Sequence, residues 1–292
     1  MRLFNPCRID PGYNPDAKSE GTVPPALSIQ TYTDGHSHPV AALAVDPQST
    51  TLVSTSDKVV VVTDIVSKKI KRRFHGHAGM INAVACSNDA ETIFSAAYDG
   101  TVRIYDGRSR NTDPIQILTE AKDSVSSVLV EQAQNHAEIL TAGIDGVLRT
   151  YDLRMGEVRC DDVGDPITGI AATRDGLCLA VTCLDGTIRL VQRSSGELLH
   201  KYAGGHTAGN YALGISLTSD DSYIVSGSED GAVALYDIVE GNVVRTLQGH
   251  AKPTCAVAAH PMRDLSSVLV SVGYDGKAIV WSSRSHAAEF ER

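Results

Sequence analysis

Short apolar runs rich in valine, isoleucine and alanine recur along the whole chain, and polar turns separate them. In AAYDGTVRIYDGR (96–108), Val102 and Ile104 alternate with larger polar residues after an Asp-Gly turn. A period of two is typical of a β-strand, and β-branched residues favour strands. We find no long run with the 3.6-residue period of an amphipathic helix. The pattern therefore predicts an all-β protein.

The same phrase returns along the chain at nearly constant spacing. Neighbouring copies lie 40 to 46 residues apart, measured between the aspartates that mark their turns: Asp57, Asp99, Asp145, Asp185, Asp230 and Asp275. Each interval holds four strand-like segments. A repeat of this length and content is typical of a β-propeller blade. We therefore expect residues 1–292 to form a single propeller domain.

Seven segments have the pattern of a third blade strand, and the first of them, MRLFNP (1–6), stands at the start of the sequence. That blade has no inner strands in this sequence, so we expect a seven-bladed type of propeller whose first blade is incomplete. Residues 1–32 would form this partial blade with a long loop, residues 33–283 six repeats, and residues 284–292 a C-terminal tail. Two explanations stay open: a missing N-terminal stretch, or six full blades plus a two-stranded remnant with exposed edges, which native proteins avoid.

The repeat resembles that of the WD-repeat family, and the resemblance covers nearly the whole chain. Blades of that family carry Gly-His before the inner strand, Ser or Thr in the second strand, Asp in the next turn and Trp-Asp at the end of the third strand. The resemblance implies structural tetrads, complete or partial, at His77, Ser95, Asp99 and Tyr105, at Thr141, Asp145 and Tyr151, at His206, Ser226, Asp230 and Tyr236, and at His250, Ser271, Asp275 and Trp281.

Such a set has a structural role that does not require catalysis. A histidine between a carboxylate and a hydroxyl can donate and accept at once, and a fully bonded buried network fixes one strand register. The same residue types form hydrolase triads, but a set that recurs in blade after blade indicates architecture. Two blades depart from the pattern: the one ending at Tyr151 has no Gly-His, and the one ending at Val191 keeps only Asp185. We expect looser loops in both.

Five longer stretches extend the resemblance beyond the general repeat. They are FHGHAGMINAVACS (74–87), YDGRSRNTDPIQILTEAKDSVSSV (105–128), RTYDLRMGE (149–157), DPITGIAATRDGLCL (165–179) and SEDGAVALYDIVEG (228–241). Together they resemble the mitogen-activated protein kinase organizers, a family of WD-repeat scaffolds. The resemblance implies a non-enzymatic platform for kinase-cascade components, in a family that is also found with the spliceosome. The resemblance implies protein partners, either kinase-cascade components or splicing factors. Strand patterns cannot decide between them, because fold alone does not specify function.

An arginine pattern supports an alternative function. Arg103 and Arg108 flank one Tyr-Asp pair, and Arg149 and Arg154 flank another. This resembles the box with which some WD-repeat proteins dock on the adaptor of cullin-type ubiquitin ligases, through guanidinium groups that meet carboxylates. The alternative hypothesis is therefore a substrate receptor with a cullin-ligase adaptor as its partner. Against it, Arg103 and Arg149 have a simpler interpretation, in which their stems pack on the blade.

Five basic residues fall within the segment KKIKRR (68–73): Lys68, Lys69, Lys71, Arg72 and Arg73. Basic charge on an outer strand blocks pairing with other chains. The functional alternatives are nuclear import, an RNA backbone or an acidic partner. The net charge of −9 argues against a reader of duplex DNA. We expect nucleic acid to be contacted only indirectly, and the chain to be a monomer outside its complex.

The remaining sequence features exclude several classes of function. The six cysteines form no CxxC pair, and the histidines of GHSH (35–38) and HGH (75–77) lack partners at the spacing of a zinc site. No glycine-rich phosphate loop, apolar signal segment or 18-residue apolar run is present. We expect no cofactor, no metal, no membrane contact and no enzymatic activity. We also expect the protein in the cytoplasm and the nucleus.

Overall fold

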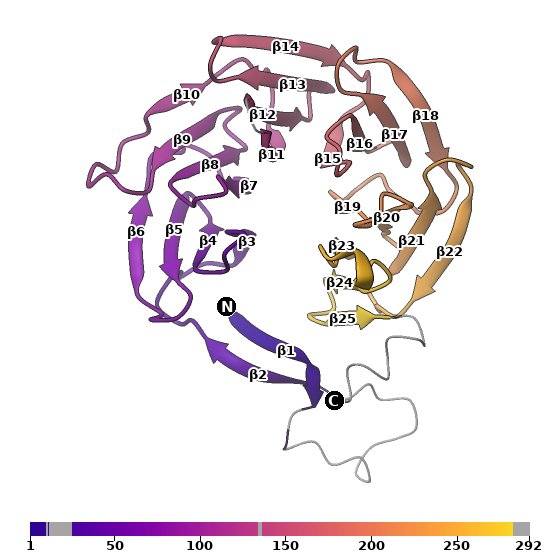
Figure 1. Ribbon diagram of the computed structural model, residues 1–292, viewed down its shortest axis with the longest axis horizontal. Helices are drawn as coiled ribbons and strands as arrows, with labels where there is room; N and C mark the ends of the chain where they lie inside the picture. Colours follow the sequence, from indigo (N-terminus) through magenta and orange to yellow (C-terminus); the bar gives the residue numbers. More distant parts are fainter. Residues whose placement is uncertain (10, 12–24, 134–135, 283–292) are drawn as a thin grey trace.

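The computed structural model describes residues 1–9, 11, 25–133 and 136–282. These residues form seven antiparallel sheets that follow one another around a central axis (Figure 1), which confirms the all-β propeller. The single helical element in this part of the chain is one 3₁₀ turn, η2 (Arg263–Leu265). None of the described segments is a helix long and apolar enough to cross a membrane.

Five of the sheets have four strands, and in each of these the chain passes from the axis to the rim. Their strands are β3 (Val40–Val45), β4 (Thr51–Ser56), β5 (Val59–Asp64) and β6 (Ile70–Phe74); β7 (Ile81–Cys86), β8 (Thr92–Ala97), β9 (Val102–Asp106) and β10 (Gln116–Leu118); β11 (Val125–Ala133), β12 (His136–Gly143), β13 (Val147–Asp152) and β14 (Glu157–Asp162); β15 (Ile167–Ala172), β16 (Cys178–Cys183), β17 (Thr187–Gln192) and β18 (Leu198–Ala203); and β19 (Ile215–Leu217), β20 (Tyr223–Gly227), β21 (Ala232–Asp237) and β22 (Val243–Gln248). The two remaining sheets consist of β23 (Thr254–Ala259), β24 (Leu269–Gly273) and β25 (Ala278–Trp281), and of β1 (Arg2–Ile9) with β2 (Ala26–Thr31).

The incomplete sheet lies where the repeat pattern places the first blade. β1 and β2 pair antiparallel, with Arg2 opposite Thr31, and among the described strands nothing pairs with the other edge of β1. Six sheets therefore have the form of blades, and the described residues do not form a seven-bladed ring. The tail predicted at 284–292 and most of the long loop after β1 lie outside the described residues.

The recurring Asp-Gly pairs close the hairpin between the second and third strands of a blade. After β8, the Ala97 amide donates to the Thr101 carbonyl and the Gly100 amide donates to the Ala97 carbonyl. Gly100 has φ +73°, a left-handed conformation that glycine adopts without a steric penalty. The Asp99 carboxylate accepts the Thr101 amide at 3.0 Å. These bonds explain why the phrase requires aspartate followed by glycine.

The apolar core is divided among the interfaces between neighbouring sheets. Val53 and Val60 of one sheet pack with Ile81, Ile93 and Tyr105 of the next, and similar clusters fill four further interfaces. Fully burying one such aliphatic side chain contributes about 1.5–3 kcal/mol. Each of the six sheets from β3 to β25 is therefore stabilised by packing against a neighbouring sheet.

Candidate functional site

In each blade, side chains joined by hydrogen bonds or ion pairs connect the inner strand or the loop before it to the second strand, the third strand or the turn between them. We call this group of side chains the blade lock. In the β7–β10 sheet, His77 Nε2 lies 2.7 Å from Ser95 Oγ and His77 Nδ1 lies 3.0 Å from Asp99 Oδ2. Asp99 also accepts the Ala78 amide at 2.8 Å. The ring of Tyr105 stacks on a phenylalanine, with 4.6 Å between the ring centroids.

The ionisation of this lock follows from its burial. Desolvation lowers the pKa of His77, although its hydrogen bond to Asp99 opposes that effect. Burial alone would raise the pKa of Asp99, but hydrogen bonds from Thr101, Ala78 and His77 outweigh it and hold that pKa well below its usual range. The lock therefore pairs a neutral imidazole with an ionised carboxylate near neutral pH.

The lock of the β23–β25 sheet links all four residues of the tetrad that the resemblance implied. His250 Nδ1 lies 3.1 Å from Asp275 Oδ1, and His250 Nε2 lies 2.8 Å from Ser271 Oγ. The indole of Trp281 donates to the same Ser271 hydroxyl at 2.8 Å. Hydrogen bonds from Ala251, Lys277 and His250 outweigh desolvation and lower the pKa of Asp275 to about 2.

The β19–β22 sheet arranges its tetrad differently. His206 Nδ1 lies 2.6 Å from the Tyr236 hydroxyl, which also accepts the Gly205 amide at 3.1 Å. Ser226 donates to the Gly227 carbonyl, and Asp230 accepts the Ala232 amide instead of bonding to the histidine. A tyrosine hydroxyl both donates and accepts, so Tyr236 meets the histidine ring directly. The resemblance implied a contact between His206 and Asp230. The structure instead pairs His206 with Tyr236, which corrects that expectation.

The two blades without Gly-His use arginine in place of histidine. Arg149 on β13 binds Asp145 with both terminal nitrogens, at 2.6 and 3.2 Å, and is 3% exposed. Arg189 on β17 holds Asp185 at 3.1 Å and also contacts Asp165. In both blades the arginine stands four residues after the turn aspartate. These two blades, where the sequence predicts looser loops, therefore have a second kind of lock.

Other residues of the β11–β14 sheet, and of the loop before it, complete the lock that contains Arg149 and Asp145. Thr141 is buried in β12. The Tyr151 hydroxyl donates to Glu120 at 3.1 Å, and desolvation, followed by the Glu120 charge, raises the pKa of Tyr151. The Lys122 amide donates to Asp145 at 3.0 Å, so the preceding loop is tied through its backbone.

One further lock was missed at the sequence level. In the β3–β6 sheet, His36 Nε2 lies 2.7 Å from Ser54 Oγ. The Gly35-His36 pair is the signal that could have revealed it. The turn aspartate of this blade, Asp57, instead adopts a left-handed conformation itself, with φ +50°.

The four arginines of the Tyr-Asp boxes divide into two pairs. Arg103 lies against Gly76, where a Cβ atom would come within 2.4 Å of its guanidinium, and Arg149 is buried in its lock. The prediction that Arg149 contacts a partner is therefore corrected. Arg108 is mostly exposed and binds Glu91 at 2.8 Å, and Arg154 is exposed in the turn after β13.

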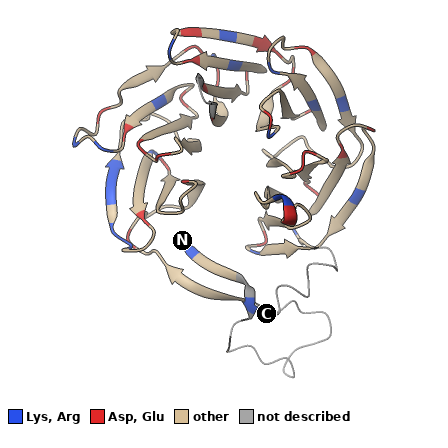
Figure 2. Cartoon of the chain, viewed as in Figure 1, with Lys and Arg blue, Asp and Glu red and all other residues tan. Residues whose placement is uncertain are grey.

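The basic segment forms the rim of the β3–β6 sheet, where Figure 2 shows its positive charge on β6. Lys71 binds Asp64 at 3.1 Å. Arg72 donates to the Ser109 carbonyl at 3.1 Å, and Arg73 donates to the carbonyls of residues 34 and 35. Lys68 and Lys69 are exposed in the turn before the strand. Part of the segment therefore joins neighbouring loops, and these two lysines remain available to a partner.

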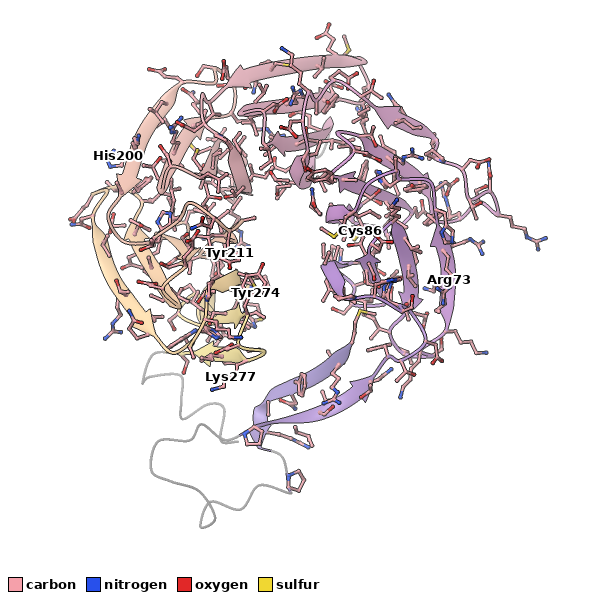
Figure 3. All side chains as sticks on the ribbon, turned by 180° about the vertical axis from the view of Figure 1, so that it is seen from behind. Arg73, Cys86, His200, Tyr211, Tyr274 and Lys277 are labelled. Carbon is pink, nitrogen blue, oxygen red and sulfur yellow. The ribbon has the colours of Figure 1, made fainter. Side chains whose placement is uncertain are left out.

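Exposed aromatic side chains stand at the turns beside the locks. Tyr98 and Tyr274 directly precede turn aspartates. Figure 3 shows Tyr211 beside Tyr274, and their ring centroids lie 5.4 Å apart. Tyrosine is enriched at protein interfaces because it combines a large apolar area with a polar tip.

Other chemistry is limited in the part of the chain that the structure describes. No group of histidine, cysteine or acidic residues there could hold a metal ion. A hollow of about 710 Å³ lies between the β11–β14 and β15–β18 sheets. Arg193 on its wall pairs with Glu138 at 2.6 Å and also with Glu131. Arg193 is thus paired with two of the acidic groups of this hollow.

The comparison with known families decides the assignment. The model of the "WD domain, G-beta repeat" matches residues 27–64, 68–106, 196–237 and 241–282, more than half of the chain. The chain belongs to the WD-repeat family. The matched segments leave out residues 107–195, which hold both arginine locks.

Named relatives of this WD-repeat protein include the "WD repeat domain-containing protein 83 homolog" of Dictyostelium discoideum. The two are 30% identical over 254 residues, which is 78% of each chain. The chain is also 41% identical over 182 residues to "WD repeat domain-containing protein 83" of Rattus norvegicus and 39% identical over 181 residues to that of Homo sapiens. These two matches cover 62% of this chain and 55% of the length of each mammalian relative.

Proposed function

We propose that this WD-repeat protein is a non-enzymatic scaffold that assembles a multiprotein complex, as the mitogen-activated protein kinase organizers do. The complex would serve a kinase cascade, pre-mRNA splicing or both, in the cytoplasm and the nucleus. The observation that carries the proposal is the similarity to WD repeat domain-containing protein 83 homolog across 78% of both chains. A rigid disc with two faces and a rim can hold several proteins together, which raises their effective concentration.

The locks support a role without catalysis. Ser95 and Ser271 are fully buried, and each hydroxyl is bonded to its histidine. A nucleophilic serine must reach its substrate, and these two cannot. WD-repeat propellers are generally non-enzymatic scaffolds. The exposed tyrosines beside the locks supply contact area for proteins instead.

The test is affinity purification of the tagged full chain from its own cells, followed by mass spectrometry. We expect kinase-cascade components or splicing factors to be enriched over a tag-only control, and imaging of the tagged chain to place it in both compartments. Substituting Tyr274→Ala and Tyr211→Ala should reduce that recovery without changing the melting temperature. Recovery of neither class of protein would contradict the proposal.

A second candidate function is supported by the exposure of Arg108 and Arg154, one at each Tyr-Asp box. It is a substrate receptor of a cullin-type ubiquitin ligase, with the ligase adaptor as partner. The double variant Arg108→Ala, Arg154→Ala should then lose the adaptor during co-purification. Arg245→Ala, at an exposed position on β22, is the matched control. Adaptor recovery that is the same for both variants would remove this candidate.

A further inference from the structure

The structure joins two basic segments on the rim of the ring. One is the segment 68–73, in the turn before β6 and on β6, and the other is the loop 107–115, which connects β9 to β10 in the next sheet. The Arg72 guanidinium donates to the carbonyls of Ser109 and Arg108, at 3.1 and 3.5 Å. Figure 2 shows positive charge on both segments. Two stretches that are distant in the sequence therefore form one surface.

Two of the basic side chains on this surface already have acidic partners. Lys71 binds Asp64 at 3.1 Å, and Arg108 binds Glu91 at 2.8 Å. Because opposite charges at this separation attract one another, the charges of Lys71 and Arg108 are compensated within the chain. We therefore do not count them as sites for a further anion.

Five other cations of this surface have no carboxylate partner among the described residues. Arg72 and Arg73 donate to main-chain carbonyls, which carry no net charge and leave each guanidinium positive. Figure 3 shows Arg73 on the outer strand β6. Lys68, Lys69 and Arg110 are exposed, and no acidic side chain in the described part of the chain pairs with them. We call the surface formed by these five residues the basic rim surface.

The two arginines on β6 are ordered before any partner binds. Arg73 donates to the carbonyls of residues 34 and 35, at 2.8 and 2.9 Å, and Arg72 donates to three carbonyls. A guanidinium has five N–H groups, so each arginine can still donate to an anion. Since these side chains are already held, binding an anion costs them less conformational entropy than it costs a mobile side chain.

The outer edge of β6 does not favour the addition of another strand. Lys71 lies in a bulge between the pairs Val62–Arg72 and Thr63–Ile70, and its carbonyl accepts the Arg72 guanidinium at 3.0 Å. A bulge interrupts the regular row of main-chain groups that an added strand would need. Recognition at this surface therefore depends on the charged side chains.

We propose that the basic rim surface binds an acidic segment of a partner protein. Carboxylates have the charge and the planar geometry that guanidinium groups bind best. Exposed aliphatic side chains lie in the same two segments: Val66, in the turn before β6, is 82% exposed, and Ile115, at the end of the loop, is 65% exposed. A segment that mixes acidic and aliphatic residues would contact both kinds of group.

A single-stranded nucleic acid has the same sign of charge but fits this surface less well. Proteins that bind single strands stack the bases on exposed aromatic rings. Residues 64–73 and 107–115 contain no aromatic residue. The apolar contacts that these segments offer are aliphatic, which favours a protein segment.

The first experiment measures the binding of a fluorescent peptide to the full chain by fluorescence anisotropy. The peptide has about twelve residues, glutamates with a valine at every third position, so that it can follow the five residues of β6 and reach the loop. We expect saturable binding that weakens as salt is added. The chain has a net charge of −9, so attraction of this acidic probe requires a local basic site.

A charge-reversal variant tests the surface directly. Lys68→Glu, Lys69→Glu and Arg110→Glu together should weaken peptide binding at least about tenfold, because they replace attraction by repulsion. All three positions are exposed and lie outside the blade locks, so the melting temperature should stay that of the unchanged chain. Absence of saturable binding would overturn the proposal.

The matched control makes the same change in net charge at exposed positions elsewhere on the ring. It combines Arg245→Glu on β22 with Lys252→Glu and Lys277→Glu at the β23–β25 sheet. Screening by salt limits the effect of distant charges, so binding should change by less than about twofold. An equal loss in the two triple variants would overturn the proposal.

A second experiment locates the peptide on the unchanged protein. A photoreactive group at the centre of the peptide should crosslink to residues 64–73 or 107–115, as read by mass spectrometry. Crosslinks found only elsewhere would overturn the proposal. A single-stranded RNA of about twelve nucleotides should displace the peptide poorly at equal concentration. RNA that binds this surface more tightly than the peptide does would overturn the assignment to a protein segment.

This surface is independent of the exposed tyrosines that support the proposed function. The variant with Tyr211→Ala and Tyr274→Ala should bind the peptide as the unchanged chain does. Failure to recover kinase-cascade components or splicing factors would therefore count against the proposed function, whereas failure to bind the peptide would count against the basic rim surface alone.

Discussion

At the residue scale, the blade lock is formed by a histidine in some blades and by an arginine in others. Where Gly-His precedes the inner strand, the histidine bonds to a hydroxyl group: His36, His77 and His250 bond to the serine of the second strand, and His206 bonds to Tyr236. Where it is absent, an arginine on the third strand binds the turn aspartate. The sequence predicted the first kind because its members belong to a recognisable motif. It could not predict the second, because Arg149 and Arg154 look alike along the chain and only folding buries one of them.

The burial of Arg149 predicts a large difference between two neighbouring arginines. Arg149→Ala leaves the Asp145 carboxylate buried without its cation, so we expect a loss of about 3–5 kcal/mol in the free energy of unfolding. Arg154→Ala, at an exposed position, should change it by less than about 0.5 kcal/mol. Urea denaturation of both variants measures the difference. Similar midpoints would contradict the arginine lock.

Buried histidines predict a stability that depends on pH. Burial lowers the pKa of His77, His206 and His36 from the ordinary value of 6.5. The unfolded chain therefore takes up protons at a higher pH than the folded chain, so this stability is full above about pH 6.5 and is lost as the pH falls below it. The free energy of unfolding should be lower at about pH 5 than at about pH 7. In urea titrations, His77→Gln should flatten this dependence, and a dependence of equal steepness in that variant would argue against it.

At the element scale, the strands and Asp-Gly hairpins follow directly from the sequence. Period-two patterning and turn chemistry are local properties, so the segment 96–108 already indicated its strands and its turn. The role of β6 is not local. Its basic residues suggested a solvated edge or a binding site, whereas Arg72 reaches across to the loop of the next sheet. Contacts between blades join residues far apart in the chain, and strand patterns carry no information about them.

The Arg72 contact predicts that one surface loop is held in place. Its guanidinium donates to the carbonyls of Ser109 and Arg108, in the loop between β9 and β10. Arg72→Ala should free this loop and speed tryptic cleavage after Arg108 and Arg110 by several-fold. Lys69→Ala removes a charge from an exposed position nearby and should leave the cleavage rate unchanged. Equal rates for the two variants would show that the contact does not restrain the loop.

At the scale of the whole molecule, the repeat spacing predicted the propeller and the incomplete first blade. It could not show how the ring ends. That depends on how the first and last sheets meet, and strand patterns carry no information about contacts between sheets so far apart in the chain. Because each core cluster lies between two sheets, stability is close to a sum over neighbouring interfaces. Sheets in the middle of the chain have two complete neighbours, whereas the β3–β6 and β23–β25 sheets each have one, because the described strands between them are only β1 and β2.

This division predicts a gradient of stability around the ring. Amides in β12 and β16, flanked by complete sheets, should exchange with deuterium most slowly, whereas those in β1 and β24 should exchange fastest. Hydrogen exchange followed by mass spectrometry measures the order. Uniform exchange around the ring would contradict the nearest-neighbour description.

The two arginine locks also set which loops are open to evolutionary change. His77 and Asp99 lie 22 residues apart, so the loop that carries the histidine cannot lose it without unlocking the blade. Arg149 and Asp145 lie four residues apart on one hairpin, and the preceding loop binds Asp145 through a backbone amide that almost any residue provides, while its Glu120 accepts the Tyr151 hydroxyl. Apart from Glu120, that loop can exchange its side chains or accept insertions while the Arg149–Asp145 pair stays closed. New specificity would therefore arise most readily in the loop in front of β11, because the loop in front of β15 contributes the Asp165 carboxylate to the Arg189 lock.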